Sequence, residues 1–223
     1  MKSSFNAFGS IRKDYGNPSV PIWLGKVSPV PVGGSLDASN IVAGALYPAG
    51  SPIQLDGKVI KVLVAFEVVS FTSGDVNDTI VIKPHIAGQA KILPVAGNCI
   101  QKIGATFDAK GKAASVVSVA VGTEGNFDVQ VAHNTTDALA KGDYITLSAS
   151  SVAGANKSIA VIPTHYLYND IYLGDIDVEN EMAGASGSAV AFHADGIIIN
   201  RTPSAPFAAQ MKAAVPGVLQ VNY

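Results

Sequence analysis

From Ile41 onward the chain alternates short apolar, β-branched runs with clusters of Gly, Pro, Asn, Asp and Ser. The runs are mostly about four to eight residues long, which suits strands and is too short for helices of ordinary length. β-Branched side chains favour the pleated sheet, and Gly and Pro interrupt helices. The sequence therefore predicts an all-β fold, a β-sandwich or barrel, with strands at 52–56, 58–69, 79–86, 90–94, 98–103, 114–121, 127–132, 143–149, 158–163, 188–193 and 196–199.

Two Asp-Gly pairs and one helical segment stand out within this pattern. Asp56-Gly57 and Asp195-Gly196 each predict a hairpin, because glycine tolerates the positive φ of tight turns. A helix is expected at 204–215, where Ser204 can cap the first turn and Pro206 fits inside it. Its apolar face consists of Phe207, Met211 and Val215, and the helix is expected to end at Pro216-Gly217. Residues 218–223 then predict a last strand or a packed tail.

Residues 1–40 differ from the rest and predict an extended N-terminal arm. The segment contains Pro18, Pro21, Pro29 and Pro31, and each proline fixes φ and removes an amide donor. The β-rich domain is then expected at 41–223, with 70–160 as an inserted β-region. Disordered tails rarely carry large apolar side chains. We therefore expect the arm to contact a partner surface, such as a neighbouring subunit, through Phe5, Phe8, Arg12, Tyr15 and Trp23. The alternative is that the arm folds back on its own domain as an edge strand.

The chain is also poor in charge. Charged residues make up 14%, hydrophobic residues 48%, and the mean hydropathy is +0.31. Few charges are available to cover the surface, so we expect much of it to meet other chains. The net charge is −2 without charged runs, which signals neither a nucleic-acid partner nor a membrane. The N-terminus lacks the continuous apolar stretch of a secretory signal.

Candidate chemistry is sparse. Ser186 lies in a Gly/Ser-rich run, but the run does not match Gly-x-Ser-x-Gly, and one sequence cannot place His165, His193 or Asp170 beside it. The four histidines are isolated, and the single cysteine, Cys99, predicts a small buried side chain. An acidic cluster lacks the frame of a calcium loop and predicts a solvated loop; it consists of Asp170, Asp175, Asp177, Glu179 and Glu181. We expect no catalytic residue, cofactor or metal, and no enzymatic activity.

Two parts of the chain resemble a known family. Residues 43–59 contain the bend Pro48-Ala49-Gly50-Ser51-Pro52, followed by a run, the Asp56-Gly57 turn and a second run. Residues 167–171, with Leu167-Tyr168-Asn169-Asp170, are followed by the run 188–196. In both parts the sequence is similar to tailed-phage head fibre and capsid-decoration (auxiliary capsid) proteins. The resemblance covers roughly 41–69 and 160–215 and leaves 70–160 outside it.

The resemblance implies a β-tulip-like or sandwich-like core and a structural protein of a phage virion. Such a protein would bind the major capsid protein and copies of itself as a homo-oligomer, a dimer or trimer. It would lie on the capsid surface after assembly in the host cytoplasm. The family brings no catalytic residues to carry over. Two alternatives stay open: a carbohydrate- or receptor-binding β-module on a virion, and a serine hydrolase using Ser186. Neither the oligomer number nor the position on the capsid follows from the sequence.

Overall fold

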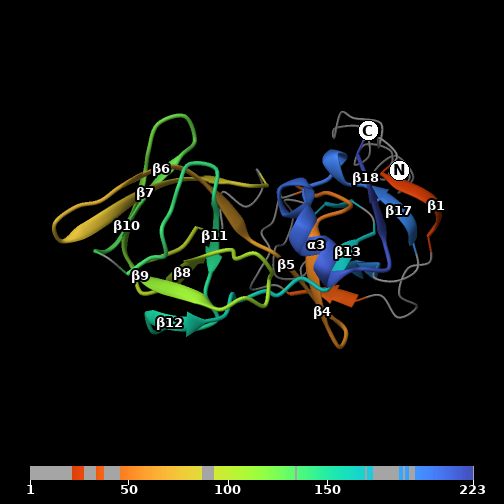
Figure 1. The fold of residues 1–223 in the computed structure, drawn as a ribbon, viewed down its shortest axis with the longest axis horizontal. Coiled ribbons are helices and arrows are strands. Elements are labelled where there is room, and N and C mark those ends of the chain that lie inside the picture. The colour runs from red at the N-terminus through yellow and green to blue at the C-terminus, as the bar shows by residue number, and fades with distance from the viewer. Residues whose placement is uncertain are drawn as a thin grey trace, which may run out of the picture.

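A computed structural model describes residues 22–27, 34–37, 46–86, 93–133, 135–168, 170–172, 186–187, 189–190 and 194–222. Strands account for most of the regular structure, and the helices within these residues are short and near the C-terminus, so the predicted all-β fold is confirmed. The chain forms two regions, which lie at opposite ends of the molecule in Figure 1. The barrel region comprises residues 65–157, and the base region comprises the described parts of 22–64 and 158–222.

The barrel region is one antiparallel sheet that closes on itself. Its strands run in the order β10-β7-β6-β11-β8-β9, and an additional β10–β9 pairing closes the ring, with β12 attached to the outside of β9. Since β11 returns beside β8 after the hairpin-linked strands β8, β9 and β10, the connection is a Greek key. The strands are β6 (Ala65–Thr72), β7 (Asn77–Pro84), β8 (Cys99–Lys102), β9 (Gly111–Val121), β10 (Phe127–Ala132), β11 (Tyr144–Leu147) and β12 (Gly154–Lys157).

The barrel interior is filled by one residue in two along each strand. Val64, Phe66, Val68, Ile80, Ile82, Ile100, Ala114, Val116, Val129, Val131 and Ile145 form its buried core. The alternation is clearest in β7, where Asp78, Ile80 and Ile82 point inward and their neighbours are partly exposed. This period of two is the pattern that closes a barrel around aliphatic side chains.

The base region joins segments that are far apart in sequence. A three-stranded sheet places β17 (Ala194–Ile198) between β1 (Trp23–Val27), which is antiparallel to it, and β18 (Leu219–Val221), which is parallel. A two-stranded sheet pairs β3 (Leu46–Tyr47) with β14 (Ile171–Tyr172). The third sheet has the order β15-β2-β5-β4-β13-β16, made of β15 (Ser186–Gly187), β2 (Gly34–Leu36), β5 (Val59–Val62), β4 (Pro52–Asp56), β13 (His165–Leu167) and β16 (Ala189–Val190). Since its two outermost strands are separated by one residue in sequence, this sheet curls round.

A shared core joins the two regions. It contains Ala65, Ile103 and Phe107 from the barrel side together with Tyr166, Ile197 and residues of the C-terminal helical segment. That segment consists of η3 (Ile199–Arg201), η4 (Ala205–Phe207) and α3 (Ala208–Ala214). Phe207 lies at the centre of the contact: its ring packs edge-on against Tyr144 at 4.9 Å and His85 at 5.3 Å, and tilted against Phe107 at 6.1 Å. The base region thus packs against the outside of the barrel.

The C-terminal expectations are confirmed. The helix lies inside the predicted range, Phe207, Met211 and Val215 are buried in the shared core, and Leu219–Val221 forms a last strand. Ser204 precedes the helical segment, but its hydroxyl donates to the Gly50 carbonyl rather than to a helical amide.

Several strand predictions need correction. The run 58–69 is two strands, because Leu63 and Val64 between β5 and β6 face opposite ways, Leu63 into the shared core and Val64 into the barrel. Residues 158–163 form no strand beyond a single bridge at Ile159. Of 90–94, residues 93 and 94 are not in a strand and the others lie outside the described residues.

Only one of the two predicted hairpins exists. Asp56-Gly57 turns between β4 and β5 as expected, with Asp56 paired to Val59 and Gly57 at φ +60. The Asp195-Gly196 prediction was wrong, since β17 continues through both residues and Gly196 pairs with Leu24 and Leu219. A Cβ at this glycine would lie 3.1 Å from the Leu219 carbonyl oxygen. Glycine here permits close strand approach rather than a turn.

The predicted arm is in part a component of the base region. Although residues 1–40 were expected to extend away from the domain, β1 pairs with β17 and β2 pairs in parallel with β5. The alternative of an edge strand therefore describes residues 23–27, because prolines flank this segment but none lies within it. The predicted insertion at 70–160 corresponds in position to the barrel region.

Candidate functional site

Of the residues expected to contact the capsid or a subunit, Trp23 is the one that falls within the described residues; Phe5, Phe8, Arg12 and Tyr15 lie outside them. Trp23 is half-buried in β1 and packs on the shared core. Its Nε1 donates to the Tyr168 carbonyl oxygen at 3.0 Å, and its ring meets Tyr166 edge-on at 6.3 Å. This chain therefore supplies a surface for part of the Trp23 side chain, and the contact of its exposed part with the capsid or a subunit stays a prediction.

The residues considered with Ser186 give little chemistry. Ser186 lies in β15, but its side chain lies outside what the structure describes, as does the whole of His193. His165 is partly buried, its Nδ1 lies 2.8 Å from the Thr164 hydroxyl, and burial lowers its pKa. The Asp170 carboxylate accepts from the Ala49 amide at 2.6 Å, and the rest of its acidic cluster lies outside the described residues. Cys99 is buried, as predicted.

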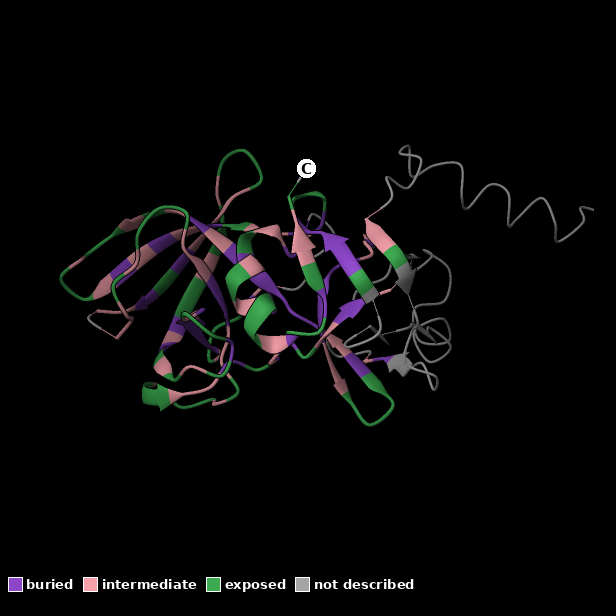
Figure 2. Ribbon diagram, turned by 45° about the vertical axis from the view of Figure 1, so that its right-hand side comes forward, coloured by how far each residue is buried: buried purple, intermediate pink, exposed green. Residues whose placement is uncertain are grey.

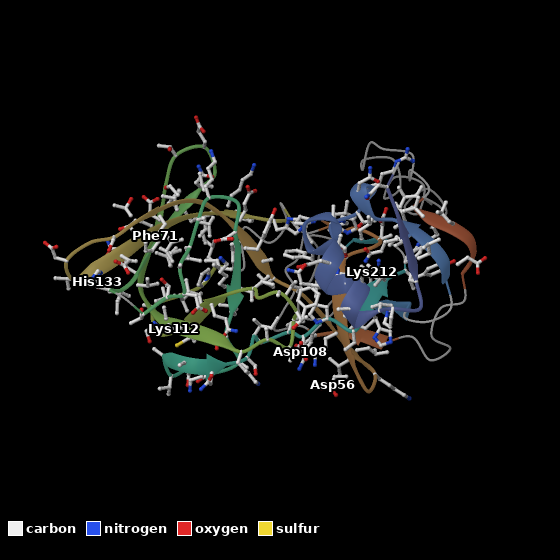
Figure 3. The ribbon with its side chains drawn as sticks, in the orientation of Figure 1. Asp56, Phe71, Asp108, Lys112, His133 and Lys212 are labelled. Carbon is white, nitrogen blue, oxygen red and sulfur yellow. The ribbon has the colours of Figure 1, made fainter. Side chains whose placement is uncertain are left out.

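A cleft at one mouth of the barrel brings together side chains that the sequence did not connect. At this mouth β6 and β10 end and β7 and β9 begin, so the loops 73–76 and 133–143 meet above the core. The cleft has a volume of about 360 Å³ and is lined by Phe71, Ser73, Asp78, Lys112, Thr136, Asp137 and Ala138. Figure 3 shows Phe71, Lys112 and His133 on this region, far from Lys212 on α3.

Asp78 anchors one wall of the cleft. Its side chain is 2% exposed, and its Oδ1 lies 2.8 Å from His133 Nδ1 while accepting from the Ser73 hydroxyl at 3.1 Å and the Gly74 amide at 3.2 Å. Ser73 Oγ also lies 3.4 Å from the same His133 nitrogen. In a catalytic triad the nucleophile and the carboxylate occupy different imidazole nitrogens. This group has the geometry of an anchor that ties the 73–76 turn to the end of β10.

The opposite wall of the cleft is also fixed by hydrogen bonds. Asp137 Oδ2 accepts from the Lys112 backbone amide at 2.9 Å. Farther along the loop, Asp143 Oδ2 accepts from Lys102 Nζ and from the Ala140 amide, both at 2.7 Å, and Lys102 Nζ also donates to the Ala138 carbonyl at 3.1 Å. The loop that frames the cleft is therefore pinned to β8 and β9 at several points.

The barrel also has an outer wall in which two neighbouring rows of residues carry few charges. Strand register aligns Ala120, Asp128, Val81 and Ser70 in one row and Ser118, Gln130, Thr79 and Thr72 in the next, across β9, β10, β7 and β6. Asp128 is the one charged residue in these two rows. Figure 2 shows buried positions alternating with exposed and partly exposed ones along the strands of this region. Val117, at the bulge of β9, is 45% exposed.

Sequence reasoning missed the cleft because its residues come from four separate segments. His133 was treated as isolated, yet β10–β7 pairing places Ala132 opposite Asn77 and so brings His133 to Asp78. The sequence of β7 did carry a signal. Its inward-facing and outward-facing positions alternate, and Asp78 occupies an inward-facing position among apolar residues. A buried carboxylate requires partners.

Comparisons of the chain with protein-family models, with curated proteins and with solved structures give no match. Within the residues that the structure describes, no group of three or more His, Cys, Asp or Glu side chains is arranged to hold a metal ion. None of the helices among these residues combines the length and the apolar character needed to cross a bilayer.

Proposed function

We propose that this chain is a structural protein of a phage virion, an auxiliary protein of the decoration or head-fibre type. In this proposal the base region attaches to the major capsid protein and the barrel region is displayed outward. The protein acts by contact and not by catalysis. It lies on the capsid surface and assembles with copies of itself.

The observation that carries this proposal is the convergence of the sequence segments that resemble the family. The Gly50 amide donates to the Leu167 carbonyl at 2.7 Å, and the Leu167 amide donates to the Ser51 carbonyl at 2.9 Å. β16, from the run 188–196, pairs with β13 through Val190 and Tyr166. Segments more than a hundred residues apart in sequence thus form one unit in the base region, as expected if they belong to one ancestral domain that received the barrel as an insertion.

The placement of β1 supports different roles for the two regions, attachment for the base and outward display for the barrel. β1 lies at the end of the base region that is farthest from the barrel in both ribbon views. The chain before Ile22 joins the base region at this end, and in this proposal Phe5, Phe8 and Tyr15 contact the shell from there. The charge-poor wall of the barrel would face outward or meet a neighbouring copy.

The test is a comparison of two changes at the start of the chain. Deletion of residues 1–20 should leave the melting temperature nearly unchanged and abolish incorporation into particles, because it removes the contact residues and spares β1. Trp23→Ala should instead lower stability by about 2 kcal/mol, since a half-buried indole and its hydrogen bond are lost.

Occupancy is measured by mass spectrometry of purified particles, and stability by thermal unfolding of the free protein. Trp23→Phe serves as the control that keeps the ring and loses the bond to Tyr168. Wild-type occupancy of the truncated chain would contradict attachment through residues 1–20. Absence of the full-length protein from particles would contradict the virion role itself.

A further inference from the structure

The cleft at the barrel mouth has features that neither the base region nor the proposed attachment uses. Its 360 Å³ volume falls in the lower part of the range of small-molecule sites, which is about 300–1,000 Å³. Its two walls are fixed by the buried Asp78 anchor and by the Asp137–Lys112 contact described above. Such walls need little ordering when a ligand binds, which lowers the free-energy cost of binding.

The cleft offers a ligand both hydrogen-bond donors and a hydrogen-bond acceptor. Among the described residues, the Lys112 ammonium and the second carboxylate oxygen of Asp137 have no partner in the protein. They offer donors and an acceptor on the lining of one cleft, to which Thr136 also contributes. Phe71 adds a partly exposed ring that rests on the barrel core. The cleft thus has one apolar surface and a polar rim that both donates and accepts.

We infer that this cleft binds a neutral sugar residue of a glycan. A sugar ring has a C–H face that packs on an aromatic ring, and hydroxyls that donate to a carboxylate and accept from an ammonium in one orientation. Two carboxylates, Asp78 and Asp137, line the cleft against the one ammonium of Lys112, which disfavours anionic sugars. The inference goes beyond the proposed virion role, because it concerns the isolated chain and stands whether or not that chain enters a particle.

The first experiment applies the purified full-length chain to an array that holds neutral and sialylated glycans. Binding is expected to glycans with a neutral terminal hexose or N-acetylhexosamine, and not to those capped by sialic acid. A hit is then titrated as the free sugar, with chemical shifts of the barrel amides as the readout. Shifts should concentrate at 71–78, 111–113 and 133–138.

Variants of the cleft separate this site from binding elsewhere. Lys112→Met removes the ammonium donor, and Asp137→Asn removes the negative charge and replaces one acceptor oxygen by a donor. Each should lower affinity at least about tenfold, and Phe71→Leu should do the same while keeping an apolar core side chain. Lys212→Met and Asp108→Asn, exposed residues outside the cleft, are the matched controls and should bind as wild type.

Lys112→Met keeps the experiment interpretable if Phe71→Leu or Asp137→Asn disturbs folding, because the Lys112 side chain is exposed. Absence of any neutral glycan signal on the array overturns the inference. So does a hit whose affinity is unchanged by Lys112→Met, and so does a preference for sialylated glycans.

Discussion

The barrel and base regions reach stability by different routes. The barrel takes one continuous stretch of chain, pairs its strands in a Greek key, and buries aliphatic side chains in its interior. The base collects short strands from distant parts of the sequence and depends on buried aromatic rings, among them Tyr47, Tyr166 and Phe207. All pairings of the barrel lie within residues 65–157, whereas the base requires contacts between segments more than a hundred residues apart. The regions should therefore respond differently to the same kind of change.

The largest effect is expected at Phe207, where the two regions meet. Phe207→Ala removes the ring that contacts His85, Phe107 and Tyr144 and should lower the free energy of unfolding by about 3–5 kcal/mol. We expect the loss to fall on the base, so that urea unfolding separates into two transitions with the barrel unfolding last. Ile80→Ala, a truncation confined to the barrel core, is the control and should shift the barrel transition. A single transition at the wild-type midpoint for Phe207→Ala would show that the contact contributes nothing.

A smaller effect is expected at Gly50, in the bend that joins the base segments. Its φ is +78, and a Cβ there would lie 2.7 Å from Thr202 Cγ2, so Gly50→Ala should cost about 2–4 kcal/mol from backbone strain and overpacking. Gly57→Ala is the matched change, with φ +60 and no heavy atom within 4 Å, and should cost about 1 kcal/mol. The check is chemical denaturation.

Thr202→Ser removes the methyl group that the new Cβ would meet. The double variant Gly50→Ala with Thr202→Ser should recover part of the lost stability, leaving the strain of positive φ and the 2.8 Å approach to Cβ of residue 202. If Gly50→Ala and Gly57→Ala cost the same, the close packing of the bend is not what constrains position 50.

The smallest effect concerns acidification of the contact between the regions. Burial lowers the pKa of His85 from 6.5, partly offset by its hydrogen bond to the Pro203 carbonyl and by Glu67. The folded state therefore favours the neutral imidazole, so the contribution of His85 is complete above about pH 6.5 and is lost as pH falls toward the lowered pKa. Urea midpoints between about pH 7 and pH 5 should fall less steeply in His85→Gln than in wild type. Burial also lowers the pKa of His165, so the His85→Gln variant should keep the part of the pH dependence that comes from His165. Identical slopes in the variant and the wild type would contradict the assignment to His85.

The contrast between the regions also explains what the sequence could reveal. In the barrel, β10 matches its predicted range, and β7, β8, β9 and β11 lie within a few residues of theirs, because alternation and turn residues are local signals. In the base, the helix and the Asp56-Gly57 hairpin were predictable for the same reason. The packing of Trp23 on its own domain was not predicted, since nothing near Trp23 in sequence indicates that Tyr166 and Tyr168 will meet it. The cleft was invisible for a related reason, as Asp78 and His133 become neighbours only through strand pairing.

The three-stranded sheet of the base has a consequence for biosynthesis. Trp23 pairs with Ile197, and Ile197 pairs with Gln220, so the earliest and latest described strands complete the same sheet through β17. During translation β1 emerges long before its partner β17 exists, whereas every strand of the barrel finds its partners within residues 65–157. The barrel should thus fold on the ribosome while the base waits for the end of the chain. Until then Trp23 and its aromatic surroundings stay exposed, and chaperone binding to stalled chains should drop only after the last strand leaves the exit tunnel.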